Sequence, residues 1–196
     1  MVFIDFHGTL CHDLFWRSLP GEHQARIQSF LARDGHAMLT PWMRGELSAE
    51  SVNHKVAEAT GMPFQSVWAS FVRECETMHI QATALKAIDR LRQDAVVLLV
   101  TDNMDCFSRF TVPALGLDRH FDGISNSSET GILKADGNGA IFRQLAEHWG
   151  MHEDACTLLD DSADACANVT AMGGRAIRIE RRGDLDLALQ HLLSPP

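Results

Sequence analysis

The sequence predicts an α/β protein: a doubly wound, Rossmann-like parallel sheet with a small α-helical domain inserted near its start. Two observations carry this prediction. Short apolar runs alternate with helical patterns along the chain, and one interval between two such runs is far longer than the others. With 196 residues, of which 45% are hydrophobic and 22% charged, the chain is long enough to bury a substantial apolar core and has an ordinary globular composition.

Five short apolar runs have the composition of buried parallel strands. Helical patterns separate them, so we expect right-handed crossovers and helices on both faces of the sheet. The runs cover residues 2–6, 95–100, 121–125, 156–159 and 175–179, and the third of them has the weakest pattern.

The interval between the first two runs predicts an inserted domain. It spans about ninety residues, whereas a crossover needs only a dozen or so. Ser48 is placed to cap a helix that ends near Thr60, and Pro63 is placed to open another helix. That second helix has an apolar stripe typical of helix packing, made of Phe64, Val67, Trp68, Phe71 and Val72. We therefore expect a helical cap domain over residues 13–80 and an α/β core formed by residues 1–12 and 81–196.

Charge and cysteine content limit the partners and the compartment. The formal net charge of −9 disfavours binding to nucleic acid or to an anionic membrane, and no apolar run is long enough to cross a bilayer. No secretory signal is expected at the N-terminus. The five cysteines form no C-x-x-C pair and are interpreted as reduced thiols of a cytoplasmic protein: Cys11, Cys75, Cys106, Cys156 and Cys166. Nothing in the sequence indicates the oligomeric state.

Polar residues follow the predicted strands at the edge where open parallel sheets bind ligands. Carboxylates there would suit a hard cation such as Mg²⁺, a lysine would offset anionic oxygens, and hydroxyl or amide groups would bind the substrate. We therefore predict a phosphate site. Its residues are Asp5, His7, Thr9, Thr101, Asn103, Lys134, Asp160 and Asp161. Taken singly, each has an ordinary alternative, such as a helix cap near Ser162 for the acidic pair or a solvated side chain for the lysine.

Four segments, in sequence order, resemble the motifs of the haloacid dehalogenase (HAD) superfamily. They read V-F-I-D-F-H-G-T-L, V-V-L-L-V-T, G-I-L-K-A-D and L-L-D-D-S. The family shows D-x-D-G-T, a strand ending in Thr or Ser, a lysine, and a strand ending in an acidic pair. In addition, W-M-R-G-E-L-S-A-E resembles a stretch of caps inserted just after the first motif. The resemblance covers nearly the whole chain.

This resemblance implies a Mg²⁺-dependent phosphatase that acts on a small phosphorylated metabolite. Asp5 would be the nucleophile, forming an aspartyl-phosphate, and also a metal ligand. The main-chain carbonyl of His7 and the Asp161 side chain would complete the ligand set, with Asp160 supporting the metal. Thr101 and Lys134 would hold the phosphate, beside the substrate-binding groups of Thr9 and Asn103.

His7 departs from the pattern of the family's phosphatases. They have a second aspartate two residues after the nucleophile, which protonates the leaving group and then activates water. An imidazole titrates near neutrality and is competent for both steps, but a space-filling or substrate-contacting role stays open. Two other functions also stay open: a haloacid dehalogenase-type carbon–halogen hydrolase, which needs no Mg²⁺, and a degenerate member that binds its ligand without turnover.

Overall fold

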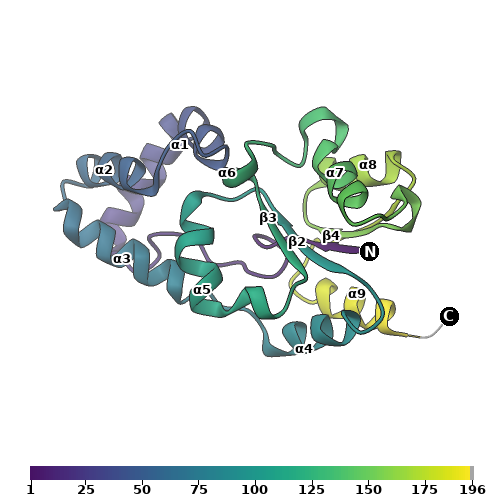
Figure 1. Cartoon of the computed structure of the whole chain (residues 1–196). Coiled ribbons are helices and arrows are strands. Elements are labelled where there is room, and N and C mark those ends of the chain that lie inside the picture. Colours follow the sequence, from purple (N-terminus) through teal and green to yellow (C-terminus); the bar gives the residue numbers. More distant parts are fainter. Residues whose placement is uncertain (195–196) are drawn as a thin grey trace.

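The computed structural model describes residues 1–194, apart from the side chain of residue 36. Its centre is a five-stranded sheet with the order β3-β2-β1-β4-β5, in which every neighbouring pair is parallel (Figure 1). All five predicted strands are confirmed, although their ends shift by a residue or two. Their bounds are β1 Val2–Ile4, β2 Val97–Thr101, β3 Gly123–Asn126, β4 Thr157–Asp160 and β5 Arg175–Arg178.

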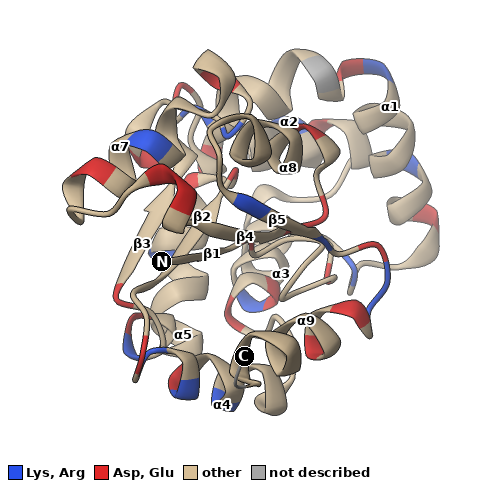
Figure 2. Ribbon diagram, turned by 90° about the vertical axis from the view of Figure 1, so that its right-hand side faces the viewer, with Lys and Arg blue, Asp and Glu red and all other residues tan. Residues whose placement is uncertain are grey.

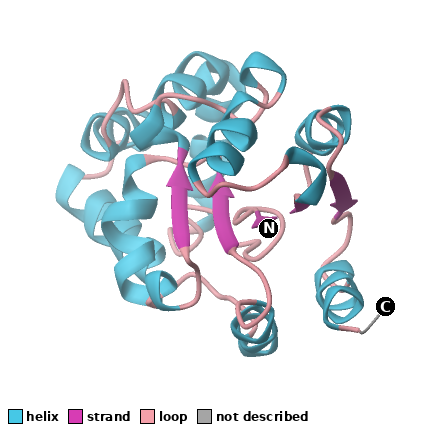
Figure 3. Cartoon of the chain, turned by 45° about the vertical axis from the view of Figure 1, so that its right-hand side comes forward, coloured by secondary structure: helices cyan, strands magenta, loops and turns pink. Residues whose placement is uncertain are grey.

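Helices cover both faces of the sheet, as the doubly wound prediction requires (Figure 3). Because side chains alternate along a strand, Ile4 of β1 packs on one face and Phe3 on the other. The Ile4 face is covered by α4 (Ala82–Leu91) and α9 (Asp184–Leu193). The Phe3 face is covered by α7 (Ala140–His148) and α8 (Ala163–Ala171). All three residues of β1 are buried, which explains why this strand reads as an unbroken apolar run.

Three helices follow β1 and form a separate group at one end of the molecule (Figure 1). They are α1 (Gly21–Met43), α2 (Ala49–Thr60) and α3 (Phe64–Glu76), and all lie within the interval 13–80. Their own apolar core contains Trp16, Trp42 and Phe71, with ring centroids 5.6 to 6.4 Å apart. Ser48 caps α2 as predicted, because its Oγ accepts a hydrogen bond from the Ser51 amide. We refer to this group as the cap.

Hydrogen bonds tie the cap to loops at the carboxyl edge of the sheet. Trp42 Nε1 donates to Asp105 Oδ1 at 2.7 Å, and the Arg44 guanidinium donates to both oxygens of Asp136 at 2.7 and 2.8 Å. Gly45 brings the two backbones close together: its φ is +73°, and a Cβ there would lie 2.2 Å from the Ser128 carbonyl oxygen. The cap is therefore held beside the polar strand ends.

Charge lies mainly on the outer helices and loops, whereas the strands at the centre carry little of it (Figure 2). Acidic and basic residues are interspersed rather than separated onto opposite faces. Within residues 1–194, no helix is both long and apolar enough to span a membrane.

Candidate active site

Three aspartates meet at the carboxyl ends of β1 and β4. Asp5 directly follows β1, and its amide donates to the Leu159 carbonyl at 3.0 Å. Asp160 is the last residue of β4, and Asp161 begins the turn into α8. One carboxylate oxygen from each of Asp5, Asp160 and Asp161 lies within 4.8 Å of the other two. The parallel pairing of β1 with β4 thus joins residues that are far apart in the sequence.

Lys134 reaches the same point from the loop before α7. Its Nζ donates to Asp5 Oδ1 at 2.8 Å and to Asp160 Oδ2 at 2.7 Å, and the residue is only 6% exposed. The Lys134 amide donates to Asp102 Oδ1 at 2.9 Å, and its carbonyl accepts from Asn168 Nδ2. Asp102 therefore anchors the lysine loop, a role that the sequence analysis missed because only the loop's tertiary position reveals it.

Burial and neighbouring charges shift the pKa values of Asp5, Asp160 and Lys134. Burial raises the pKa of the Asp5 carboxyl, Lys134 partly offsets this rise, and Asp161 adds to it. Burial and the neighbouring Asp5 raise the pKa of Asp160 to about 6, against the opposing effect of Lys134. Burial disfavours the Lys134 ammonium, but Asp5 and Asp160 outweigh it and raise the lysine pKa, so the ammonium keeps its proton. Three carboxylates thus face one buried cation.

A glycine turn brings the first motif against Asp161. Gly8 has a φ of +89°, and a Cβ at this position would lie 2.3 Å from Asp161 Oδ2. Only glycine combines that conformation with that close approach. The Gly8 amide donates to the Cys11 carbonyl at 2.8 Å, which closes the turn. His7, on the same turn, has an exposed side chain that lines the cavity described below.

Two of the predicted substrate-binding residues lie at the carboxyl end of β2, but only Asn103 lines the cavity that contains Asp5 and Asp161. Thr101 is 1% exposed, and within residues 1–194 its hydroxyl has no hydrogen-bond partner, which is unusual for a buried polar group. The Asn103 amide donates to Ser127 Oγ at 3.0 Å, and its Oδ1 accepts from the Met104 amide at 2.9 Å. Thr101 thus has a buried hydroxyl without a partner in the described residues, its predicted role in binding phosphate stays a prediction, and Asn103 is fixed in place.

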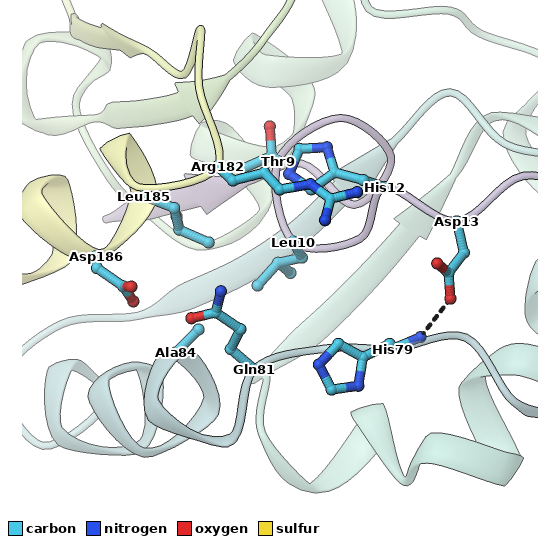
Figure 4. Close-up of a pocket in the computed structure, with 10 residues that line it drawn as sticks. All are labelled: Thr9, Leu10, His12, Asp13, His79, Gln81, Ala84, Arg182, Leu185 and Asp186. Carbon is cyan, nitrogen blue, oxygen red and sulfur yellow. Dashed lines mark hydrogen bonds between the residues drawn. The ribbon is translucent and has the colours of Figure 1, made fainter.

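Thr9, predicted to bind substrate, lines a different and smaller cavity. Figure 4 shows its side chain there with those of His12, Arg182 and His79. The His79 amide donates to Asp13 Oδ2 at 2.9 Å, as the dashed line in the figure shows. The structure thus separates Thr9 from the main cavity, and its substrate-binding role stays a prediction.

A cavity of about 580 Å³ lies between the core and the cap, and we call it the main cavity because Asp5, Asp161 and Lys134 line it. This volume is within the range of small-molecule sites, which is about 300–1,000 Å³. Its polar end is lined by Asp5, His7, Asp102, Asn103, Lys134, Asp161 and Ser162. The other walls come from the segment after β1, from α1 and from methionine side chains. A ligand in this cavity would contact the aspartates and the cap together.

No protein-family model and no curated protein matches the chain. Among solved structures, it is similar to a HAD family enzyme from Bacteroides thetaiotaomicron in complex with magnesium and inorganic phosphate. The identity is 16%, the match covers 93% of this chain and 94% of that one, and the TM-score is 0.68. A predicted HAD-like family hydrolase from Porphyromonas gingivalis is 21% identical over 100% of this chain and 98% of that one, with a TM-score of 0.70. The chain has the HAD fold.

The HAD fold also occurs in a neighbour named for another reaction. An L-2-haloacid dehalogenase from Xanthobacter autotrophicus is 16% identical, matches 99% of this chain and 84% of its own, and has a TM-score of 0.66. These similarities confirm the fold that the four motifs implied. Because one fold supports several reactions, the reaction of this chain has to be inferred from its own residues.

Proposed function

We propose that this protein is a Mg²⁺-dependent hydrolase of phosphate monoesters. The observation that carries the proposal is the cluster of Asp5, Asp160 and Asp161 around Lys134. Its carboxylate oxygens are the donors that Mg²⁺ prefers, and one ammonium leaves their negative charge in excess. Asp5, Asp161 and the carbonyl of residue 7 would hold the ion, with Asp160 beside them. When bound, the ion would neutralise phosphoryl oxygens and align them.

The proposed chemistry starts at Asp5. Its carboxylate attacks phosphorus, the bond between phosphorus and the leaving oxygen breaks, and an aspartyl-phosphate forms. Lys134, hydrogen-bonded to Asp5 Oδ1, orients this carboxylate and offsets charge on the transferring group. Water then cleaves the aspartyl-phosphate, which releases inorganic phosphate and restores Asp5. The hydroxyl of Thr101, unpartnered within the described residues, would bind a phosphoryl oxygen if the bound substrate reaches the end of β2.

His7 is proposed to move the proton in both steps. It follows Asp5 by two residues and lines the same cavity. As an acid it would protonate the leaving oxygen, and as a base it would then accept a proton from the attacking water. Its exposure keeps it in exchange with solvent protons.

Carbon–halogen hydrolysis is the second candidate, because the cavity has apolar walls and a named dehalogenase shares the fold. The same aspartate cluster opposes it. A 2-haloacid carries a carboxylate, and without a bound cation, which that reaction does not need, it would be repelled by Asp160 and Asp161 beside the nucleophile. The cluster therefore favours the phosphatase.

A parallel assay distinguishes these functions. The purified protein is incubated with phosphate esters and with 2-haloacids, each with Mg²⁺ and with a chelator, and phosphate and halide are measured. We expect phosphate release that depends on Mg²⁺. Halide release without metal would support the dehalogenase instead. Release of neither product would support a binding protein without turnover.

A further inference from the structure

The cap side of the main cavity is apolar. Ile27, Leu31, Leu39 and Met43 of α1 line it, in two pairs spaced four residues apart. Ile27 is 4% exposed, so its side chain belongs to a packed wall rather than to a mobile surface. These side chains and Asp5 line the same cavity, so a group esterified to a phosphate at Asp5 would contact them.

Two of the three polar side chains on this side are already engaged by the protein; the third, Gln28, is exposed to solvent. Arg17 is the charged residue that the cap side contributes to the cavity lining within residues 1–194. Its guanidinium donates to the main-chain carbonyls of Leu14, Glu74 and Thr77 at 3.1 to 3.3 Å. Gln24 Nε2 likewise donates to the carbonyls of residues 17 and 19 at 2.8 and 2.7 Å. Gln28 is thus the polar side chain of α1 in this lining that is left for a ligand, and the rest of the α1 surface there is apolar.

Trp16 is held rigidly in this wall. Its φ of +58° is rare for a bulky residue, and its indole Nε1 donates to the buried Asn53 Oδ1 at 2.9 Å. Because that N–H is used, the ring presents an apolar surface to the cavity. Strained backbone of this kind persists where the surrounding structure fixes it, and it concentrates at ligand sites.

These walls discriminate between leaving groups. A sugar or polyol would place its hydroxyls against leucine, isoleucine and tryptophan, where they would lose water without gaining partners. An alkyl or aryl group would instead gain about fourfold in affinity for each methylene that it buries. Resting on the phosphatase function, we propose that the substrate is the phosphate monoester of an apolar alcohol or phenol.

The first experiment compares leaving groups of increasing length. The kcat/KM is measured with Mg²⁺ for linear alkyl phosphates from methyl to octyl, for phenyl phosphate and for glucose 6-phosphate. We expect kcat/KM to rise with each added methylene, by up to about fourfold, until the cavity is filled. Glucose 6-phosphate hydrolysed faster than hexyl phosphate would overturn the inference but leave the phosphatase intact. An absence of phosphate release from every ester would refute the phosphatase itself.

The second experiment uses a matched pair of exposed leucines. Leu14 lines the cavity and is 64% exposed, whereas Leu187, on α9, is 66% exposed and is not among the residues that line it. Both tolerate a polar side chain without loss of core packing. Leu14→Asn should lower the ratio of hexyl to methyl phosphate kcat/KM by at least about twofold, and Leu187→Asn should leave it unchanged. Leu31→Asn, in the same wall, should act like Leu14→Asn. An unchanged ratio in both cavity variants would overturn the proposal.

Discussion

His7 occupies the position to which we assign proton transfer to the leaving group. It follows the nucleophile by two residues, and its side chain lines the main cavity together with those of Asp5 and Lys134. The sequence was sufficient to identify this position, because the motif spacing fixes it on the turn after β1. It was insufficient to assign the proton transfer, because that role depends on the substrate's orientation in the cavity.

His7→Ala should slow hydrolysis of alkyl phosphates by about 10²- to 10⁴-fold, the usual contribution of general acid–base catalysis. With p-nitrophenyl phosphate the first step should slow far less, because that leaving group scarcely needs a proton. Steady-state and burst kinetics on both esters separate the first step from dephosphorylation. His12→Ala is the control, since His12 lines the smaller cavity of Figure 4. If His7→Ala hydrolyses alkyl phosphates at the wild-type rate, His7 does not transfer the proton.

Asp161→Ala should weaken Mg²⁺ binding more than it lowers the free energy of unfolding. The variant loses one of three clustered carboxylates, yet Asp161 is exposed and contributes little to packing. Calorimetric titration with Mg²⁺ measures the affinity directly, and chemical unfolding measures stability. Asp118→Ala removes an equal charge from an exposed position in the short 3-10 helix Leu117–Arg119 and is the control. Equal Mg²⁺ affinities in the two variants would show that Asp161 is not a metal ligand.

At the level of elements, sequence patterns predicted the strands and the start of one helix, which depend mainly on local interactions. The strands appeared as apolar runs, and Ser48 marked the start of α2. The 23-residue helix α1 was not predicted, because it contains Pro41 and its apolar residues follow no continuous stripe. The π-helical turn Phe107–Thr111, which packs against α3 of the cap, was not predicted either. Likewise, the apolar wall of the cavity exists only once α1 lies over the strand ends.

The ion pair between Glu50 of the cap and Arg109 of the core should stabilise the protein in a pH-dependent way. Hydrogen bonds from Arg109 lower the pKa of Glu50 from 4.5 to about 2. A lowered pKa in the folded state gives stability that is complete above pH 4.5 and is lost as the pH falls towards 2. Both side chains are about 40% exposed, so we expect less than about 1 kcal/mol. The difference in unfolding free energy between wild type and Glu50→Gln should shrink over this range; a constant difference would argue against the pair.

Gly45→Ala should destabilise the protein by about 1 kcal/mol or more and displace the cap. The added Cβ would lie 2.2 Å from the Ser128 carbonyl oxygen, on a residue whose φ is +73°. Gly21→Ala is the control, since a Cβ there meets nothing within 4 Å. Urea unfolding of the two variants gives the comparison. If both unfold at the same urea concentration, the close approach of cap and core at Gly45 is wrong.

At the scale of the whole molecule, the parallel sheet and the cap line different parts of the main cavity. The strand ends gather the charged groups of the proposed reaction, and the cap adds the walls that contact the leaving group. The apolar runs were sufficient to predict the sheet, and the polar residues that follow them were sufficient to predict the meeting of Asp5, Lys134, Asp160 and Asp161, because parallel strands end at a common edge. The position of Thr9 and the anchoring of Lys134 by Asp102 required the tertiary structure.

The central claim is that Asp5 carries the phosphoryl group. Its most direct test is rapid acid quenching of the protein during turnover of a radiolabelled ester with Mg²⁺, followed by peptide mapping. We predict a labelled peptide whose acyl phosphate is on Asp5. We also predict that Asp5→Asn, which barely changes the volume of the side chain, folds normally by circular dichroism and yields neither label nor turnover. Label on another residue, or turnover by Asp5→Asn near the wild-type rate, would contradict the mechanism.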